Sequence, residues 1–190
     1  MLQQMKEIIL SHIHLSDEIF QLFQNSSKRK VATKNQLLFS SQKANKKYLF
    51  LVKGSLRGYK IVNNKDYTHH FYFQGWFATD FQSYLTEEPS DVYIETLTDV
   101  VYYEFDKEVL LNLYSQHHQL EKLGRIIAEI AYLRTVEKFS DMQTLSLKER
   151  YNKLLKINPE LFQKVLQKHI ASYFGVSEQS LSRIKNSLIS

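Results

Sequence analysis

Three polar residues near the C-terminus have the types and the spacing to read the edges of DNA bases. Gln179, Arg183 and Asn186 follow one another at intervals of four and three residues, so they share one face if the segment is helical. A glutamine amide suits adenine, a guanidinium suits guanine, and an asparagine amide suits polar base edges. The spacing therefore predicts a base-reading helix face, with Arg183 as the first base contact and Gln179 as the second.

The segment that contains these residues has the layout of a helix-turn-helix. A first apolar helix is followed by Gly175, which can end it with a positive φ, and by Ser177, which can cap a second helix. The small Ala171 allows the two helices to cross closely, and Leu181 and Ile184 give the second helix an inward face. An ordinary helical hairpin with a solvated polar face is the alternative.

The predicted contacts divide into base readers and phosphate binders. Glu178 could accept a hydrogen bond from cytosine or support Arg183. Ser177, Lys168 and Lys185 are candidates for phosphate contacts, with a purely structural cap as the alternative role of Ser177. The complete predicted set is Lys168, Ser177, Glu178, Gln179, Ser182, Arg183, Lys185 and Asn186.

Positive charge is concentrated in the same part of the chain. The protein has 25 Lys and Arg residues against 20 Asp and Glu residues. Residues 1–146 are balanced, so the whole excess lies in residues 147–190, which hold eight basic and three acidic residues. Binding to DNA phosphates requires such a local patch. A solvated basic helix pair would look the same, so charge supports the prediction without deciding it.

Length and composition favour a sensor of about 110 residues joined to a small helical module. No apolar run is long enough for a membrane span, no signal peptide is evident, and there is no cysteine among the 190 residues. We therefore expect a cytoplasmic protein that does not contact membranes. The absence of cysteine excludes disulfides, iron-sulfur clusters and a thiol switch.

The sequence pattern changes from helical to strand-like after the first section, and back to helical after the last predicted strand. Residues 1–25 read as helical, with Ser16 as an N-cap, and a basic cluster at 28–30 closes this section. Short segments rich in aromatic and β-branched residues follow, separated by turn signals, and indicate an antiparallel barrel or roll. The predicted strands are 36–39, 48–52, 55–62, 67–73, 92–97 and 100–105. Asp106 can then cap a short helix that extends to Leu113.

The longest helical pattern covers residues 116–139. Its apolar stripe contains Leu120, Leu123, Ile127 and Ile130, and a second apolar line widens it. So wide a stripe favours two partners, the roll and a second copy of the same helix, which makes these four residues the predicted dimer interface. Burial within a single subunit is the alternative.

The helical pattern breaks near residues 140–143, which predicts a hinge. Beyond it, Ser146 and Glu149 form a capping box that opens a helix over 147–156, and Pro159 separates that helix from the helix-turn-helix. The predicted fold class is therefore α+β. It has a jelly-roll-like antiparallel β-roll sensor domain at 1–115, a dimerisation helix and hinge at 116–140, and a helix-turn-helix domain at 141–190.

This organisation resembles the Crp/Fnr family of bacterial transcription regulators over nearly the whole chain. The stretch 49–57, LFLVKGSLR, looks like the family's hairpin, and 170–184 looks like the helix-turn-helix of its Bacteroidetes-type wingless members. The resemblance implies a cyclic-nucleotide-binding-like roll and a homodimer. It also implies binding to a two-fold symmetric operator in double-stranded DNA and contact with RNA polymerase.

The predicted ligand pocket departs from the family pattern. Members that bind cyclic nucleotides have a Gly-Glu pair and, about ten residues later, an Arg that neutralises the cyclic phosphate. Here Thr79 and Asp80 stand in place of Gly-Glu, and no Arg accompanies Ser90. A phosphate would meet carboxylates without a guanidinium, which is costly in a partly buried pocket. We therefore expect Thr79, Asp80 and Ser90 to line a pocket that does not take cyclic AMP in the usual way. Asp80 could line a pocket for an uncharged or cationic ligand, and a solvated loop acid is the alternative. No cofactor is predicted, and the effector is unknown.

No enzyme or metal site is predicted. His69 and His70 are adjacent in a predicted strand, so their side chains should point to opposite faces and could not share a metal ion. There is no glycine-rich phosphate loop, nucleophile elbow or pair of catalytic carboxylates. The rival interpretation is a small-molecule-binding roll whose helical tail contacts proteins instead of DNA. That interpretation does not require the basic excess at the C-terminal end.

Overall fold

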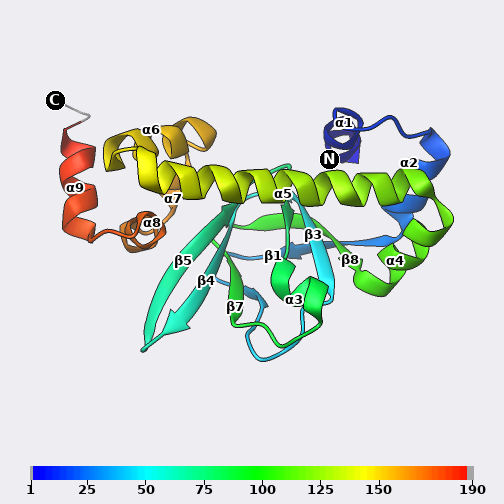
Figure 1. Ribbon diagram of the computed structural model, residues 1–190, viewed down its shortest axis with the longest axis horizontal. Coiled ribbons are helices and arrows are strands. Elements are labelled where there is room, and N and C mark those ends of the chain that lie inside the picture. The colour runs from blue at the N-terminus through cyan, green and yellow to red at the C-terminus, as the bar shows by residue number, and fades with distance from the viewer. Residues whose placement is uncertain (1, 188–190) are drawn as a thin grey trace.

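The chain, seen in a computed structural model that describes residues 2–187, combines two antiparallel sheets with one long helix and a group of short C-terminal helices (Figure 1). The long helix lies across the sheets, and the C-terminal helices gather at one of its ends (Figure 1). The predicted α+β class is confirmed. Residues 188–190, the end of the predicted third domain, lie outside the described part.

Two short helices open the chain where one helical section was expected. Helix α1 covers Leu2–Leu10 and α2 covers Asp17–Asn25, with a break between them. The predicted cap at Ser16 is confirmed, because its Oγ accepts a hydrogen bond from the backbone N–H of Ile19 at 3.3 Å. Phe20 and Phe23 of α2 are buried in the core.

The six predicted strands are present with small shifts, and two more complete the sheets. One sheet has the order β1-β8-β3-β6, formed by Ser27–Ala32, Val100–Asp106, Lys47–Lys53 and Phe77–Ala78. The other has the order β2-β7-β4-β5, formed by Leu37–Phe39, Val92–Thr96, Leu56–Val62 and Lys65–Tyr72. The basic cluster at 28–30 therefore lies within strand β1, where it had been expected to close a helical section. β6 was not predicted.

Strand β3 is covered on both faces, which explains its unbroken apolar run. Leu49 and Leu51 pack between the two sheets, whereas Phe50 and Val52 pack against a cluster that contains residues of α1, α2 and the long helix. All four side chains are at most 2% exposed. The alternation of side chains along the strand thus joins the roll to its covering helices.

Helix α3 (Phe81–Thr86) lies between β6 and β7, and α4 (Lys107–Gln116) leads into the long helix α5. Helix α5 covers His118–Thr144, so it passes through the break predicted at 140–143. That prediction was wrong, and the helix ends at Thr144 instead. Leu145 is extended, and Ser146 and Glu149 then form the predicted capping box of α6 (Leu147–Ile157).

The C-terminal helices after α6 are α7 (Leu161–Lys164), α8 (Gln167–Phe174) and α9 (Glu178–Asn186). They lie beyond the β4–β5 end of the roll, with α9 farthest from it (Figure 1). Across residues 2–187, no helix is both long enough and apolar enough to cross a membrane.

Candidate nucleic-acid interface

Gly175 and Ser177 build the turn between α8 and α9 as predicted. Gly175 adopts φ = +70°, a left-handed conformation that suits glycine, and its N–H donates to the carbonyl of Ser172 at 3.0 Å. Ser177 is extended, and its Oγ accepts a hydrogen bond from the N–H of Ser180 at 3.2 Å. The structural role of Ser177 is therefore present, and its phosphate contact stays a prediction.

The inward residues of both helices form one apolar cluster. Ile170, Ala171 and Phe174 of α8 and Leu181 of α9 are each at most 5% exposed. They pack with residues of α6 and α7, including Tyr151, Leu154 and Leu161. The backbone carbonyl of Ala171 also accepts a hydrogen bond from the N–H of Val176 at 3.0 Å, which helps to close the turn. This packing fixes which face of α9 points outward.

The outward face of α9 carries the predicted base-reading residues. Glu178, Gln179, Arg183, Lys185 and Asn186 are all exposed, whereas Ser182 is half-buried. Within residues 2–187, Arg183 and Lys185 form no ion pair with a carboxylate. The suggested support of Arg183 by Glu178 is therefore not present as an ion pair. Lys168 is exposed on α8. Helix α9 thus presents two exposed cationic side chains that no carboxylate of the described chain pairs with.

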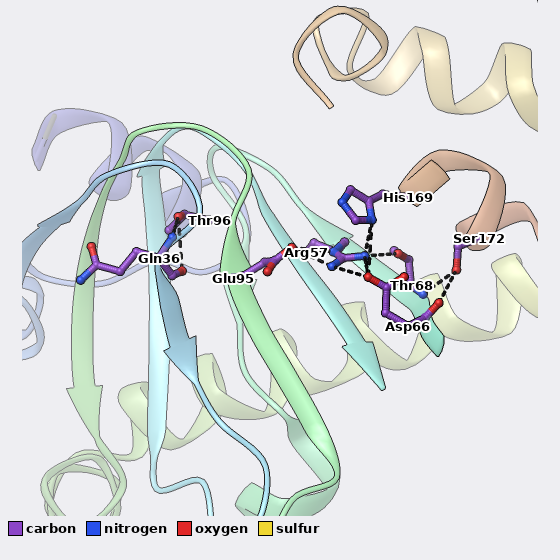
Figure 2. Close-up of polar contacts among 8 residues, drawn as sticks. All are labelled: Gln36, Arg57, Asp66, Thr68, Glu95, Thr96, His169 and Ser172. Atoms are coloured by element: carbon purple, nitrogen blue, oxygen red, sulfur yellow. Dashed lines mark hydrogen bonds and ion pairs between the residues drawn. The ribbon is translucent and has the colours of Figure 1, made fainter. Parts of the chain in front are cut away.

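A buried polar network fastens α8 to the roll (Figure 2). Its centre is Arg57 of β4, which is 2% exposed. The guanidinium donates to Asp66 at 3.0 Å, to Glu95 at 2.9 Å and to Thr68 at 3.1 Å, and it contacts Nδ1 of His169 on α8. A buried guanidinium with several charge-assisted hydrogen bonds is a strong anchor. Arg57 therefore links three strands of one sheet to the helix-turn-helix.

His169 is neutral in this network. Burial, and then the positive charge of Arg57, lower the pKa of the imidazole to about 4. An arginine can only donate hydrogen bonds, so Nδ1 of His169 must act as the acceptor and the ring proton must lie on Nε2. A second link lies beside it, where the Thr68 N–H donates to Ser172 Oγ at 2.9 Å.

Sequence reasoning did not find this network. Arg57 had drawn attention only as part of the hairpin stretch, and His169 had no assigned role. The two residues are separated by 112 positions, and no local periodicity or motif relates residues so far apart. The one available signal was an arginine next to the apolar Leu56 in a predicted strand, since an arginine requires a partner if it is buried.

The predicted ligand residues lie together, and their hydrogen bonds are made within the protein. Ser90 Oγ donates to the Asp80 carboxylate. Thr79 Oγ1 donates to the carbonyl of Lys47 at 2.8 Å and accepts from Asn45 Nδ2 at 2.6 Å. All three predicted residues are buried. Thr79 and Asp80 also lie in the wall of a cavity of about 350 Å³, which α5 lines on another side.

The face of α5 predicted to form a dimer is partly used within the subunit. Leu120 and Leu123 are 0% and 1% exposed and pack in the core of their own chain, so their side chains offer no surface to a second copy. Ile127 and Ile130 are half-buried and line the cavity. The exposed apolar side chains of the helix lie further along it, at Tyr132, Leu133, Val136, Phe139 and Met142.

A β-bulge corrects the expected orientation of His69 and His70. The register of β4 and β5 shifts between Gly58 and Tyr59, opposite His69, which breaks the alternation of side chains. Both histidines line the same cavity, and burial lowers their pKa values to about 4 and about 3. Residues 2–187 nevertheless contain no group of three His, Cys, Asp or Glu side chains that could hold a metal ion.

Comparisons with known proteins identify the fold. No protein-family model matches the chain, and no curated protein matches its sequence. The c-di-GMP responsive global regulator CLP of Xanthomonas campestris has a similar structure, with a TM-score of 0.68 and 16% identity over 91% of both chains.

Two other solved structures agree. A candidate transcriptional regulator of the crp/fnr family from Eubacterium rectale has a TM-score of 0.67 and 14% identity, over 90% of this chain and 82% of its own. The catabolite activator protein of Thermus thermophilus has a TM-score of 0.57 and 17% identity, over 92% and 84%. The fold is that of Crp/Fnr-type transcription regulators, as the sequence resemblance predicted.

Proposed function

We propose that this protein is a sequence-specific DNA-binding transcription regulator of the Crp/Fnr type, and not an enzyme. The observation that carries the proposal is the outward face of α9, where exposed Arg183 and Lys185 pair with no carboxylate of residues 2–187. DNA phosphates and guanine edges are the natural partners of such side chains. Arg183 and Gln179 read bases, Lys168 and Lys185 bind phosphates, and Glu178, Ser182, Asn186 and Ser177 complete the contact set.

We further propose that the regulator works as a homodimer. The exposed apolar side chains of α5, among them Leu133, Val136 and Phe139, follow one another at intervals of three residues and suit a second copy of the same helix. Two copies would place two α9 helices in successive major grooves, about 34 Å apart on a two-fold symmetric operator. The division at 1–115, 116–140 and 141–190, a cytoplasmic location and contact with RNA polymerase belong to the same proposal.

Cyclic AMP does not suit the loop that holds Thr79, Asp80 and Ser90. Residues 77–91 contain no Lys or Arg, and the Asp80 carboxylate would face the phosphate. The hydroxyl of Ser90 is already engaged with Asp80. We therefore propose that this loop does not receive a cyclic phosphate, and that any effector is recognised by other residues.

Selection from a randomised double-stranded DNA pool, followed by sequencing of the retained fraction, tests the function. We expect an enriched palindrome with half-sites about one helical turn apart, and the same palindrome when cyclic AMP is added. The variant Lys122→Ala is a matched control, because Lys122 is exposed near the end of α5 that lies away from α9 (Figure 1). It should enrich the same palindrome. If wild type enriches no sequence, the proposal is wrong.

A further inference from the structure

Two cations on α5 lack an acidic partner in a place where charge is costly. Arg134 and Lys138 lie one helical turn apart and are both partly buried. The Arg134 guanidinium lies 3.6 Å from the ring centroid of Trp76, and Lys138 Nζ lies 4.1 Å from that of Tyr173. Lys138 also donates to the carbonyl of His69. Among the described residues, neither cation forms an ion pair with a carboxylate.

The acidic groups closest in sequence are already engaged. Glu137 and Asp141 both bind Lys153, at 2.6 and 2.7 Å. Burial lowers the pKa of Lys138 to about 8 and lowers the pKa of Arg134 as well. Aromatic faces compensate such charges only in part. The helix therefore holds a pair of cations that an anion from outside the chain would neutralise.

Space for a bound molecule exists on both sides of this pair. The cavity of about 350 Å³ lies between the roll and α5, and a second cavity of about 170 Å³ lies where β5, α5, α6 and α8 meet. Arg134, Trp76 and His70 line both cavities. The rest of the wall includes aliphatic and aromatic side chains, such as Ile130 on one side and Tyr173 on the other. Asp80 also lines the first cavity, and Glu137 and Asp141, which pair with Lys153, line the second.

The polar groups near the cations favour an acceptor of hydrogen bonds. His69 Nε2 is buried and has no hydrogen-bond partner among the described residues. Both His69 and His70 are uncharged at neutral pH, so each can donate a hydrogen bond from a ring N–H without adding charge. Concave, mostly apolar sites with a few convergent polar groups are the usual form of small-molecule sites.

We propose that this junction binds a small organic anion, a carboxylate or phosphate carried by an apolar body, with Arg134 and Lys138 receiving the anionic group. The apolar body lies in the adjoining cavities. Lys138 also covers Tyr173 of α8, so binding changes a contact of the helix-turn-helix. This regulatory consequence rests on the proposed DNA-binding function, whereas the binding itself does not.

Three probes with one body and different head groups test the site: octanoate, octyl phosphate and octanol. Trp76 is the single tryptophan of the chain, so its fluorescence reports on the Arg134 contact directly. We expect a saturable response to at least one of the two anions. Neutral octanol should bind at least about tenfold more weakly than that anion. The relative response to the two anions then distinguishes a carboxylate site from a phosphate site.

Arg134→Gln and Lys138→Gln should each weaken binding of the anion about tenfold, and calorimetry provides a readout that does not depend on Trp76. The matched control is Arg125→Gln, because Arg125 is exposed on the same helix and pairs with Glu129. Thermal melts identify a variant that has simply lost its fold, and Arg134→Lys, which keeps the charge, should retain the response. Equal binding of anions and octanol, an equal loss in Arg125→Gln, or no response to either anion would overturn the site.

DNA selection with the same proteins separates this inference from the proposed function. Enrichment of a palindrome without anion binding would contradict the proposed anion site and support the proposed DNA-binding function. Anion binding that depends on Arg134 and Lys138, without any DNA enrichment, would support the proposed anion site and contradict the proposed DNA-binding function.

Discussion

The cations on the two sides of the helix-turn-helix differ in whether carboxylates of the described chain balance their charge. On the inner side, Arg57 is buried and its guanidinium meets Asp66 and Glu95 within 3.0 Å. On the outer side, Arg183 and Lys185 are exposed and have no carboxylate partner among the described residues. The inner cation is matched within the fold, whereas the outer cations can be matched only by another molecule.

This difference separates residues that hold the structure from residues that serve a partner. Replacing a matched, buried cation leaves its carboxylates without a counter-charge, so the fold is weakened. Replacing an unmatched, exposed cation removes nothing that the fold uses, so only binding is weakened. The cations of α5, Arg134 and Lys138, are intermediate: they are partly buried, between Arg57 and Arg183 in exposure, and like Arg183 they have no carboxylate partner among the described residues.

The largest effect is expected for Arg57→Met. The change leaves Asp66 and Glu95 close together without the guanidinium, so unfolding should become easier by about 3–5 kcal/mol. Urea denaturation measures this loss. The matched control is Arg29→Met, since Arg29 is exposed on β1 and should change stability by less than about 0.5 kcal/mol. Equal stability of the two variants would show that the network is not an anchor.

The next effect concerns DNA and leaves folding unchanged. Arg183→Ala should cost ~1 to 3 kcal/mol of specific binding and relax the preference at one base pair in each half-site. Fluorescence anisotropy with the selected palindrome and with single-base variants measures both quantities. The melting temperature should match wild type, because the exposed Arg183 side chain forms no ion pair within the described part of the chain. If specific and random DNA are weakened alike, Arg183 does not read a base.

The parts of the site that could be predicted from the sequence are those with local causes. Gly175 and Ser177 act through residues at most four positions away, so their types and spacing define the turn. The outward face of α9 follows from the same periodicity, because the apolar residues at 181 and 184 face inward. The capping box of Ser146 and Glu149 was predicted for the same reason.

The missed features depend on contacts between distant segments. The bulge that turns His69 and His70 toward one cavity arises from the pairing of β4 with β5, and residues 67–73 alone read as regular strand. The burial of Leu120 and Leu123 depends on which elements α5 meets at each turn. Its apolar stripe showed that it is covered, but not whether the roll or a second copy covers a given residue.

Acid should lower the stability of the fold through His169, on the inner side of the helix-turn-helix. The pKa of His169 is about 4 in the fold, below its ordinary value, so at intermediate pH the unfolded chain binds a proton that the folded chain does not. This linkage has no effect on stability above about pH 6.5, and stability falls as the pH drops from there toward 4. At pH 5 the loss from His169 should be on the order of 1 to 2 kcal/mol.

Urea denaturation at pH 7.5 and pH 5 measures the loss, with His169→Gln as the matched variant. Glutamine can still accept a hydrogen bond from Arg57, but it does not titrate. His69 and His70 also have lowered pKa values and weaken both proteins in acid, so the difference between wild type and variant isolates His169. If both proteins lose the same stability between the two pH values, His169 does not sense acid.

The smallest effect is expected for Lys185→Ala. A lysine that contacts phosphate carries no base preference, so the variant should bind the selected palindrome and random DNA with the same proportional loss. Its signature is the salt dependence, because one fewer counterion is released on binding. In a plot of log affinity against log salt concentration, the slope should decrease by about one per subunit. Arg183→Ala is measured in the same buffers for comparison. We expect a changed base preference in the Arg183 variant, and an unchanged base preference with a smaller slope in the Lys185 variant. These results would assign base recognition to Arg183 and phosphate binding to Lys185. A lost base preference in the Lys185 variant would instead assign both cations to base recognition.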